Sequence, residues 1–279
     1  MAAGVLLAEG VRVDSEGGGF RGCSPGGIAR LARRAIGQIG ASSNPVAAAT
    51  SAGTGAGQSL AGVGMNVNLA PVLDVYYKSG NFIDQYQRSY DNNPSVVSEC
   101  GQAFITAQQA TGVAATAKHF PGLGSATKNQ NTDTGPVTLT VSLTKLHAID
   151  EVPYPTAVSA GVKLVMVSWA IYLALDPKLP AGLSPTIIGQ ELRSRNNFTG
   201  VTISDALEAG ALNAFGSTGQ KAVTAAGAGM DLILCSAQDI TQAGAATSAL
   251  ATALGNGQLD PTAFNAAVNR VTTLRGGLF

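Results

Sequence analysis

The sequence predicts an α/β fold built on a parallel sheet, and two observations support this class. Short apolar or β-branched runs alternate with longer Ala-rich segments whose spacing suits amphipathic helices, which is typical of repeated βα units. No linker or break in composition divides the chain, so we expect residues 1–279 to form a single domain.

Six runs are the best strand candidates, because each is apolar and is followed by Gly-, Pro- or Asn-rich sequence. They are Val5–Val13, Gly64–Val75, Gly112–Phe120, Lys163–Trp169, Gly200–Asp205 and Asp231–Cys235.

The segments between these runs have the start signals of helices. Asn92 or Asn93 is a suitable N-cap for a helix over Pro94–Thr111, and Ser184 with Pro185 begins another over Pro185–Arg195. Two final helices, Thr241–Leu254 and Pro261–Leu274, flank a turn at Gly255-Asn256-Gly257.

Composition excludes several classes of partner. Lys and Arg number 17, as do Asp and Glu, so the chain lacks the basic excess that binding to a nucleic acid backbone requires. No run approaches the ~18 apolar residues of a membrane span, so no membrane partner is expected. The three cysteines, Cys23, Cys100 and Cys235, are too scattered for a metal-ligand pair or a disulfide framework and are interpreted as packing residues.

The N-terminus does not have the pattern of a signal peptide. It has no early basic residue, and Glu9 interrupts its apolar run. A cytoplasmic location is expected if the chain is complete, and secretion if a leader has been removed, so the localisation stays open.

Polar residues gather where the predicted strands end. They are Asp14-Ser15-Glu16, Asp74, Lys118-His119, Ser168-Trp169 and Ser204-Asp205. In α/β barrels the active site lies at the carboxyl ends of the strands, so five such endings favour one shared pocket over five separate surface charges.

The order of these motifs resembles the barrel domain of family 3 glycoside hydrolases. The resemblance rests on Asp14–Gly18, Ala70–Val75, Arg88-Ser89-Tyr90 before Asn93-Pro94, Lys118–Gly124 and Ser204–Leu207. Within the family, the single-domain branch of bacterial β-N-acetylglucosaminidases is the most similar. The resemblance implies a TIM-type (β/α) barrel, a sugar or glycoside substrate bound at its C-terminal face, and no metal or organic cofactor.

The resemblance also implies roles for individual residues. Asp205 matches the family's nucleophile, which attacks the anomeric carbon and must stay ionised to do so. Asp14, Arg88, Lys118 and His119 match residues that contact sugar hydroxyls. Asp74 is better explained by holding the loops of the pocket, and it is left out of the site.

The acid/base residue departs from the family's pattern. Related acetylglucosaminidases carry an Asp-x-His pair on the loop after the Lys118–Gly124 motif, but residues 125–136 contain no histidine. Three explanations stay open: Asp133 acts alone, another residue moves in, or general acid catalysis is weak. Asp133 is the favoured candidate, and His147 is expected on a helix surface.

The N-terminal side also departs from the family. The barrel normally has about two more strands before the one that leads to Asp14, so six predicted strands would leave an open edge. Three explanations of the open edge stay open: the barrel closes differently, a partner such as a second copy covers the gap, or the chain is truncated.

Two classes of function follow. The first is a retaining exo-glycosidase that removes a terminal β-linked N-acetylglucosamine through a glycosyl-enzyme on Asp205. The alternatives are a catalytically weak sugar-binding protein on the same fold, or a β-glucosidase.

Overall fold

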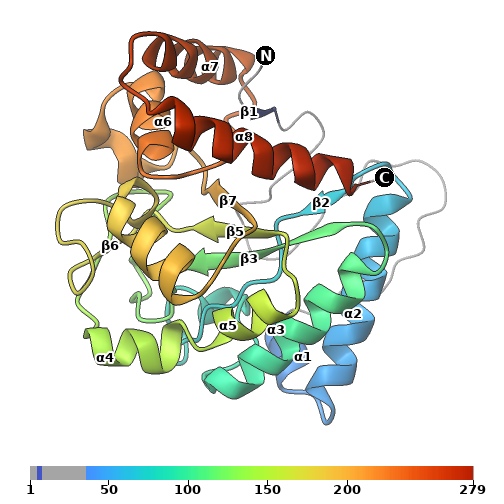
Figure 1. Ribbon diagram of the computed structural model, residues 1–279. Coiled ribbons are helices and arrows are strands. Elements are labelled where there is room, and N and C mark those ends of the chain that lie inside the picture. Colours follow the sequence, from blue (N-terminus) through green and yellow to red (C-terminus); the bar gives the residue numbers. More distant parts are fainter. Residues whose placement is uncertain (1–4, 8–35, 279) are drawn as a thin grey trace.

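A parallel sheet forms the centre of the protein. The computed structural model describes residues 5–7 and 36–278 (Figure 1). Its strands pair in parallel in the order β2-β3-β5-β7, β1 pairs with β8, and a bridge between Ile203 and Leu232 joins β7 to the segment leading into β8. These strands are β1 (Val5–Leu7), β2 (Val67–Asn68), β3 (Ala114–Phe120), β5 (Leu164–Val167), β7 (Val201–Ser204) and β8 (Ile233–Cys235).

Each of the six predicted runs contains one of these strands, so the parallel α/β class is confirmed. Two further strands were not predicted, β4 (Thr138–Leu139) and β6 (Ile171–Tyr172), which pair with each other in parallel. With two residues each, they are too short to show an apolar alternation in the sequence.

Helices lie on both sides of the sheet. In the view of Figure 1, α2 and α3 lie below the strands β2, β3 and β5, and α8 lies above them. The α-helices are α1 (Ile36–Gly40), α2 (Pro45–Ala61), α3 (Pro94–Gln109), α4 (Leu143–Lys145), α5 (Pro153–Ser159), α6 (Thr218–Gly227), α7 (Ile240–Gly255) and α8 (Pro261–Gly276). The 3₁₀ and π segments are η1 (Asp84–Tyr86), η2 (Leu146–Asp150), η3 (Ala181–Leu183), η4 (Thr186–Arg195) and η5 (Gly210–Phe215).

The structure confirms the predicted starts of two helical segments, α3 and η4. Asn93 caps α3 by accepting from the Ser95 amide at 3.0 Å. Ser184 Oγ accepts from the Ile187 amide at 3.2 Å at the start of η4. That segment is a π-helix rather than the α-helix the sequence suggested, a distinction that apolar spacing does not resolve.

Two buried clusters divide the strand residues by alternation. Leu164, Met166, Val201 and Ile203 belong to one cluster, whereas Val165 and Val167 belong to the other. Because successive strand residues point to opposite faces, the first set lies on one face of the sheet, here called the inner face, and the second lies on the opposite face, which packs against α3 and other helices.

Helix α8 completes the inner cluster. Val271 is buried in it, and Leu274 and Leu278 pack against it. Asp231 anchors the same helix, because its buried carboxylate accepts from Arg270 Nη2 of α8 at 2.7 Å. The carboxylate also accepts from Arg193 Nη2 of η4 at 2.6 Å and from the Thr202 amide at 2.9 Å. One carboxylate therefore fastens two helices to the sheet.

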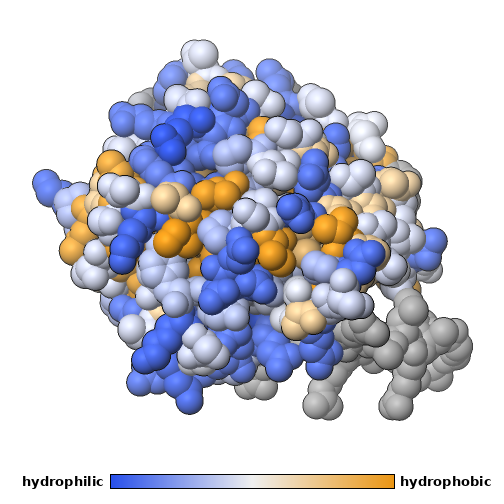
Figure 2. Space-filling model, turned by 90° about the horizontal axis from the view of Figure 1, so that it is seen from below, coloured by the Kyte–Doolittle hydropathy of each residue, from blue (hydrophilic) through white to orange (hydrophobic). Residues whose placement is uncertain are grey.

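The outer surface is mixed. On the face seen from below, apolar side chains form small groups separated by hydrophilic ones (Figure 2). None of the helices within the described residues combines the length and apolar character that crossing a bilayer requires. Cys100 and Cys235 are buried and free, as expected of packing residues, while Cys23 lies outside the described residues.

Asp231→Ala should lower the free energy of unfolding by about 3–5 kcal/mol, because it leaves two arginines without their buried partner. Urea denaturation followed by circular dichroism measures the loss. Glu99→Gln, a change at an exposed carboxylate on α3, is the control and should leave the midpoint unchanged. A loss below about 1 kcal/mol in Asp231→Ala would contradict the anchoring role.

Candidate active site

The inner face of the sheet leads to the predicted nucleophile. Val201, Ile203 and Asp205 alternate along β7 and its continuation, so the Asp205 side chain follows the inner row. Its Oδ1 accepts from the Ala206 amide at 2.8 Å. Trp169 Nε1 donates to the Ala206 carbonyl at 2.9 Å, which fixes the segment that carries the carboxylate.

Lys118 and His119 are consecutive in the sequence, yet both lie near the same charged side chains. The charges of Arg88 and Asp133 act on Lys118, and Asp133 in turn feels the charges of His119 and Arg88. The pairing of β3 with β5 shifts register between Lys118 and Phe120. Such an irregularity re-aims side chains, so two neighbouring residues of one strand can serve one pocket.

Asp74 is the fixed point of this arrangement. It is fully buried, its Oδ2 lies 2.7 Å from His119 Nδ1, and its Oδ1 accepts from the Leu123 amide at 2.7 Å. Burial alone would raise the pKa of Asp74, but the charge and hydrogen bond of His119, the Leu123 amide and Arg88 outweigh it, so the pKa lies below its usual value. Asp74 therefore holds the loop after β3, as predicted.

Arg88 reaches the same cluster from the segment after η1. Its Nη2 lies 3.4 Å from His119 Nε2. The neighbouring Ser89 hydroxyl donates to the carbonyls of Asp74 at 2.6 Å and Asp91 at 3.0 Å, which fixes the backbone beside the arginine.

Burial, reinforced by the positive charge of Arg88, lowers the pKa of Lys118 to about 8, while Asp205, Asp74 and Asp133 partly oppose the shift. Three carboxylates and two cations therefore share one region. That region lies at the carboxyl end of the parallel strands.

The loop with Asp133 is docked onto the chain that follows Asp205. The Gly210 amide donates to the Asp133 carbonyl, and the Ala211 amide to the Thr132 carbonyl, each at 2.9 Å. The Asp133 side chain is exposed. Partial desolvation raises its pKa, and the Asp205 carboxylate raises it further, with His119 and Arg88 acting in the opposite direction. A carboxyl group whose pKa is raised by a neighbouring carboxylate is suited to the acid role, with that neighbour as the nucleophile.

Glu208 was missed by the sequence analysis. Its side chain is exposed, its Oε1 accepts from the Ser236 hydroxyl at 2.5 Å, and its charge adds to the shift at Asp133. The available signal was its place three residues after Asp205.

The structure thus brings Arg88, Lys118, His119, Asp133 and Asp205 together. Asp14, the remaining predicted sugar ligand, lies outside the described residues.

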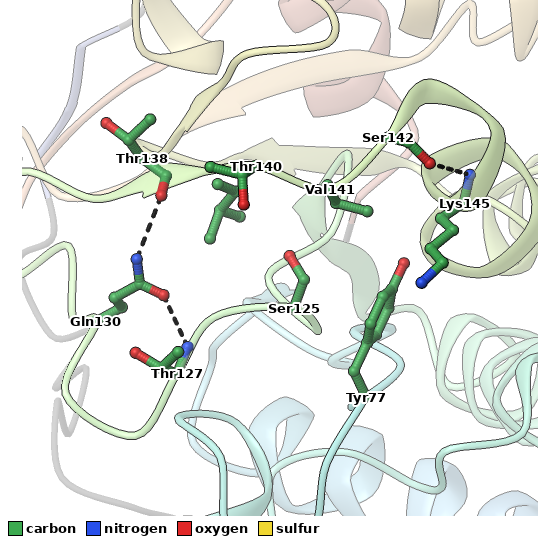
Figure 3. Close-up of a pocket in the computed structure, with 10 residues that line it drawn as sticks. Tyr77, Ser125, Thr127, Gln130, Thr138, Thr140, Val141, Ser142 and Lys145 are labelled. Atoms are coloured by element: carbon green, nitrogen blue, oxygen red, sulfur yellow. Dashed lines mark hydrogen bonds between the residues drawn. The ribbon is translucent and has the colours of Figure 1, made fainter.

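A pocket of about 520 Å³ lies beside residues 125–130 and 138–145 (Figure 3). Side chains with hydroxyl or amide groups form much of its lining, among them Tyr77, Ser125, Thr127 and Gln130, and Lys145 adds an amine. Among the site residues that the structure describes, none lines this pocket.

The fold and the site define a class: α/β proteins with a carboxylate-containing site at the carboxyl ends of parallel strands, the arrangement of barrel-type glycoside hydrolases. Comparison specifies the family. Residues 11–274 match the glycosyl hydrolase family 3 N-terminal domain, so the chain belongs to glycoside hydrolase family 3 and has that family's (β/α) barrel-domain type of fold.

The names of the relatives differ in how specific an activity they state. An uncharacterized secreted glycosyl hydrolase of the fungus Arthroderma benhamiae is 46% identical over 96% of this chain and 74% of its own length. A beta-hexosaminidase of Stenotrophomonas maltophilia is 32% identical over 61% of this chain and 49% of its own length. The fungal protein is thus more similar than this bacterial one, and a bacterial origin is not supported.

Solved structures agree with the family. A family 3 beta-N-acetylglucosaminidase from Paenibacillus sp. superposes with a TM-score of 0.84 and 32% identity, covering 95% of this chain and 49% of that one. A beta-N-acetylhexosaminidase from Beutenbergia cavernae has a TM-score of 0.78 and 31% identity, with coverages of 88% and 72%. The chain spans about half the length of the Stenotrophomonas and Paenibacillus proteins.

Gly210→Ala should loosen the Asp133 loop. A Cβ at Gly210 would lie 2.6 Å from the Thr134 carbonyl carbon and oxygen, so the loop must move away. We expect hydrogen exchange at the Gly210 amide to become at least about tenfold faster as its bond to Asp133 is lost. Gly189→Ala, where an added Cβ meets nothing within 4 Å, is the control. Unchanged exchange in Gly210→Ala would show that the loop is not held there.

Proposed function

We propose that this protein is a retaining exo-glycosidase that removes terminal β-linked N-acetylglucosamine. The observation that carries the proposal is the pair Asp205 and Asp133, in which one carboxylate raises the pKa of the other. A retaining mechanism needs such a pair, with one group ionised and one able to hold a proton.

The proposed reaction has two steps. In the first, the Asp205 carboxylate attacks the anomeric carbon while the Asp133 carboxyl gives its proton to the glycosidic oxygen, and the bond to the leaving alcohol breaks. In the second, the Asp133 carboxylate takes a proton from water, the resulting hydroxide attacks the anomeric carbon, and the ester to Asp205 breaks. Sugar is released with its configuration retained, and both carboxyl groups return to their starting states. No metal or organic cofactor enters these steps.

Sugar recognition is assigned to the basic groups around the pair. Arg88, Lys118 and His119 are proposed to donate hydrogen bonds to hydroxyls of the terminal sugar, together with Asp14 as an acceptor. The preference for N-acetylglucosamine rests on the hexosaminidases and acetylglucosaminidases among the relatives. A β-glucosidase is the alternative specificity.

A catalytically weak sugar-binding protein is the second candidate. It is favoured by the loop 125–136, which has no histidine to assist Asp133, and by the exposure of Asp133 itself. Loss of general acid catalysis lowers the rate by about 10²–10⁴-fold. The loss is smallest for substrates whose leaving group needs no proton.

We also propose a location and an oligomeric partner for the protein. The Arthroderma benhamiae relative is named as secreted, which favours the exported form of this protein. A second copy covering an open sheet edge remains the proposed oligomeric partner, because unpaired strand edges favour association.

The direct test is the release of nitrophenol from β-N-acetylglucosaminide and β-glucoside substrates. Asp205→Ala should abolish release, and Asp133→Ala should lose about 10²–10⁴-fold and regain part of it with azide as a small external nucleophile. Glu99→Gln is the control and should match the wild type. A folded wild type that binds N-acetylglucosamine but releases no nitrophenol from either substrate would overturn the glycosidase in favour of the binding protein.

The pH dependence tests Lys118 separately. With a dinitrophenyl glycoside, which needs no general acid, kcat/KM should fall as pH rises through about 8, because Lys118 loses the proton that it donates to the sugar. Lys118→Arg should shift this limb upward by at least about one pH unit, since arginine stays charged. An alkaline limb that is unchanged in Lys118→Arg would remove Lys118 from sugar binding.

A further inference from the structure

A second cluster of ionisable side chains lies outside the candidate active site. His147 belongs to η2, Glu151 follows directly after it, and Glu191 belongs to η4. The proposed glycosidase reaction uses none of them. The sequence predicts His147 on a helix surface, but its side chain is only 24% exposed and faces Glu191 of the neighbouring helix.

The three side chains converge on one point. His147 Nε2 lies 2.7 Å from Glu191 Oε1 and 4.0 Å from Glu151 Oε1, and the candidate ligand atoms all lie within 4.8 Å of one another. The side chains of Glu151 and Glu191 are 2% and 13% exposed. His147 and Glu151 are four residues apart, the spacing at which side chains of one helix face can share a ligand.

The converging atoms contact one another and Arg195, but none of them makes a well-aligned hydrogen bond. His147 Nε2, Glu151 Oε1 and Glu191 Oε1 are buried, and none has a partner in hydrogen-bond geometry among the described residues. The other oxygen of Glu151 accepts from Asn196 Nδ2 at 3.2 Å, so the protein satisfies the far side of this carboxylate and not the side facing the cluster. Buried polar atoms without partners are costly, and a bound cation would satisfy all three together.

The donor set indicates the kind of cation. One imidazole nitrogen and two carboxylate oxygens suit zinc and related divalent transition metals. In a tetrahedral zinc site with bonds of about 2.0–2.1 Å, ligand atoms lie about 3.3 Å apart. The separations of 2.7 and 4.0 Å bracket that value, so small side-chain rotations would form the site. Three protein ligands leave the fourth position to water.

We propose that His147, Glu151 and Glu191 bind a divalent transition-metal ion of the zinc class, which clamps η2 to η4. The site is separate from the glycosidase reaction and does not depend on it. Both elements are π-helical, and π-helical turns are frequently found at functional sites.

Two groups compete with the metal. Arg195 Nε lies 2.8 Å from Glu191 Oε1, but its side chain is 48% exposed and can turn outward into water. The other competitor is a proton, because burial and the Glu191 carboxylate raise the pKa of Glu151 to about 8. A proton shared by the two carboxylates is therefore the rival state that an experiment must separate from a metal.

Zinc titration of the metal-stripped full chain by calorimetry tests the proposal. We expect one zinc per chain, and at least about 100-fold weaker binding in His147→Gln and in Glu191→Gln, because each leaves only two ligands. Zinc should raise Tm by about 5 °C in the wild type and not in these variants, and a chelator should reverse the rise. Glu99→Gln is the matched carboxylate control and should bind zinc as the wild type does.

X-ray absorption at the zinc edge supplies the second readout and should show one nitrogen and two carboxylate oxygen ligands from the protein. Wild-type protein that binds no zinc, or that binds it unchanged in both variants, would overturn the site. A proton shared by Glu151 and Glu191, with no metal, would also overturn the site. In that case neither the wild type nor the variants would bind zinc, and Glu191→Gln would raise Tm in the presence of a chelator because it removes one buried negative charge.

Discussion

The buried Asp74 carboxylate is the constraint on which the candidate site depends. It joins the segment after β2 to the segment after β3, because it contacts His119 Nδ1 at 2.7 Å and accepts from the Leu123 amide at 2.7 Å. A buried carboxylate is tolerated only when charged or hydrogen-bonding groups pair with both of its oxygens. The same contacts therefore fix the positions of these partners. His119 is one of them, and Arg88 reaches its other ring nitrogen. One residue that need not touch sugar thereby positions two that are proposed to do so.

The apolar interior and the polar site belong to the same rows of side chains. Along β7, Val201 and Ile203 fill the inner cluster and Asp205 follows them where the strand ends. The opposite end of the sheet is secured by Asp231, which binds arginines from η4 and α8. Strand alternation thus supplies both the core and the direction of the nucleophile, while the loops supply its neighbours.

Much of the fold was predictable because strands buried on both faces appear in the sequence as continuous apolar runs, as in β5. The motifs located Arg88, Lys118, His119 and Asp205, and the structure places them together with Asp133. Other features depend on contacts between distant segments. The docking of Asp133 on Gly210 and the meeting of His147 with Glu191 join residues that no local pattern connects, and the two-residue strands β4 and β6 form only through their mutual pairing.

The central claim is that Asp205 becomes covalently linked to sugar, and mass spectrometry of a trapped intermediate tests it most directly. Asp133→Ala should react with a dinitrophenyl β-N-acetylglucosaminide, whose leaving group needs no proton, and then hydrolyse slowly because no base activates water. After proteolysis, the peptide containing Asp205 should carry the mass of one N-acetylglucosaminyl group. Dinitrophenol release with the label on Glu208, or on any carboxylate other than Asp205, would contradict the account.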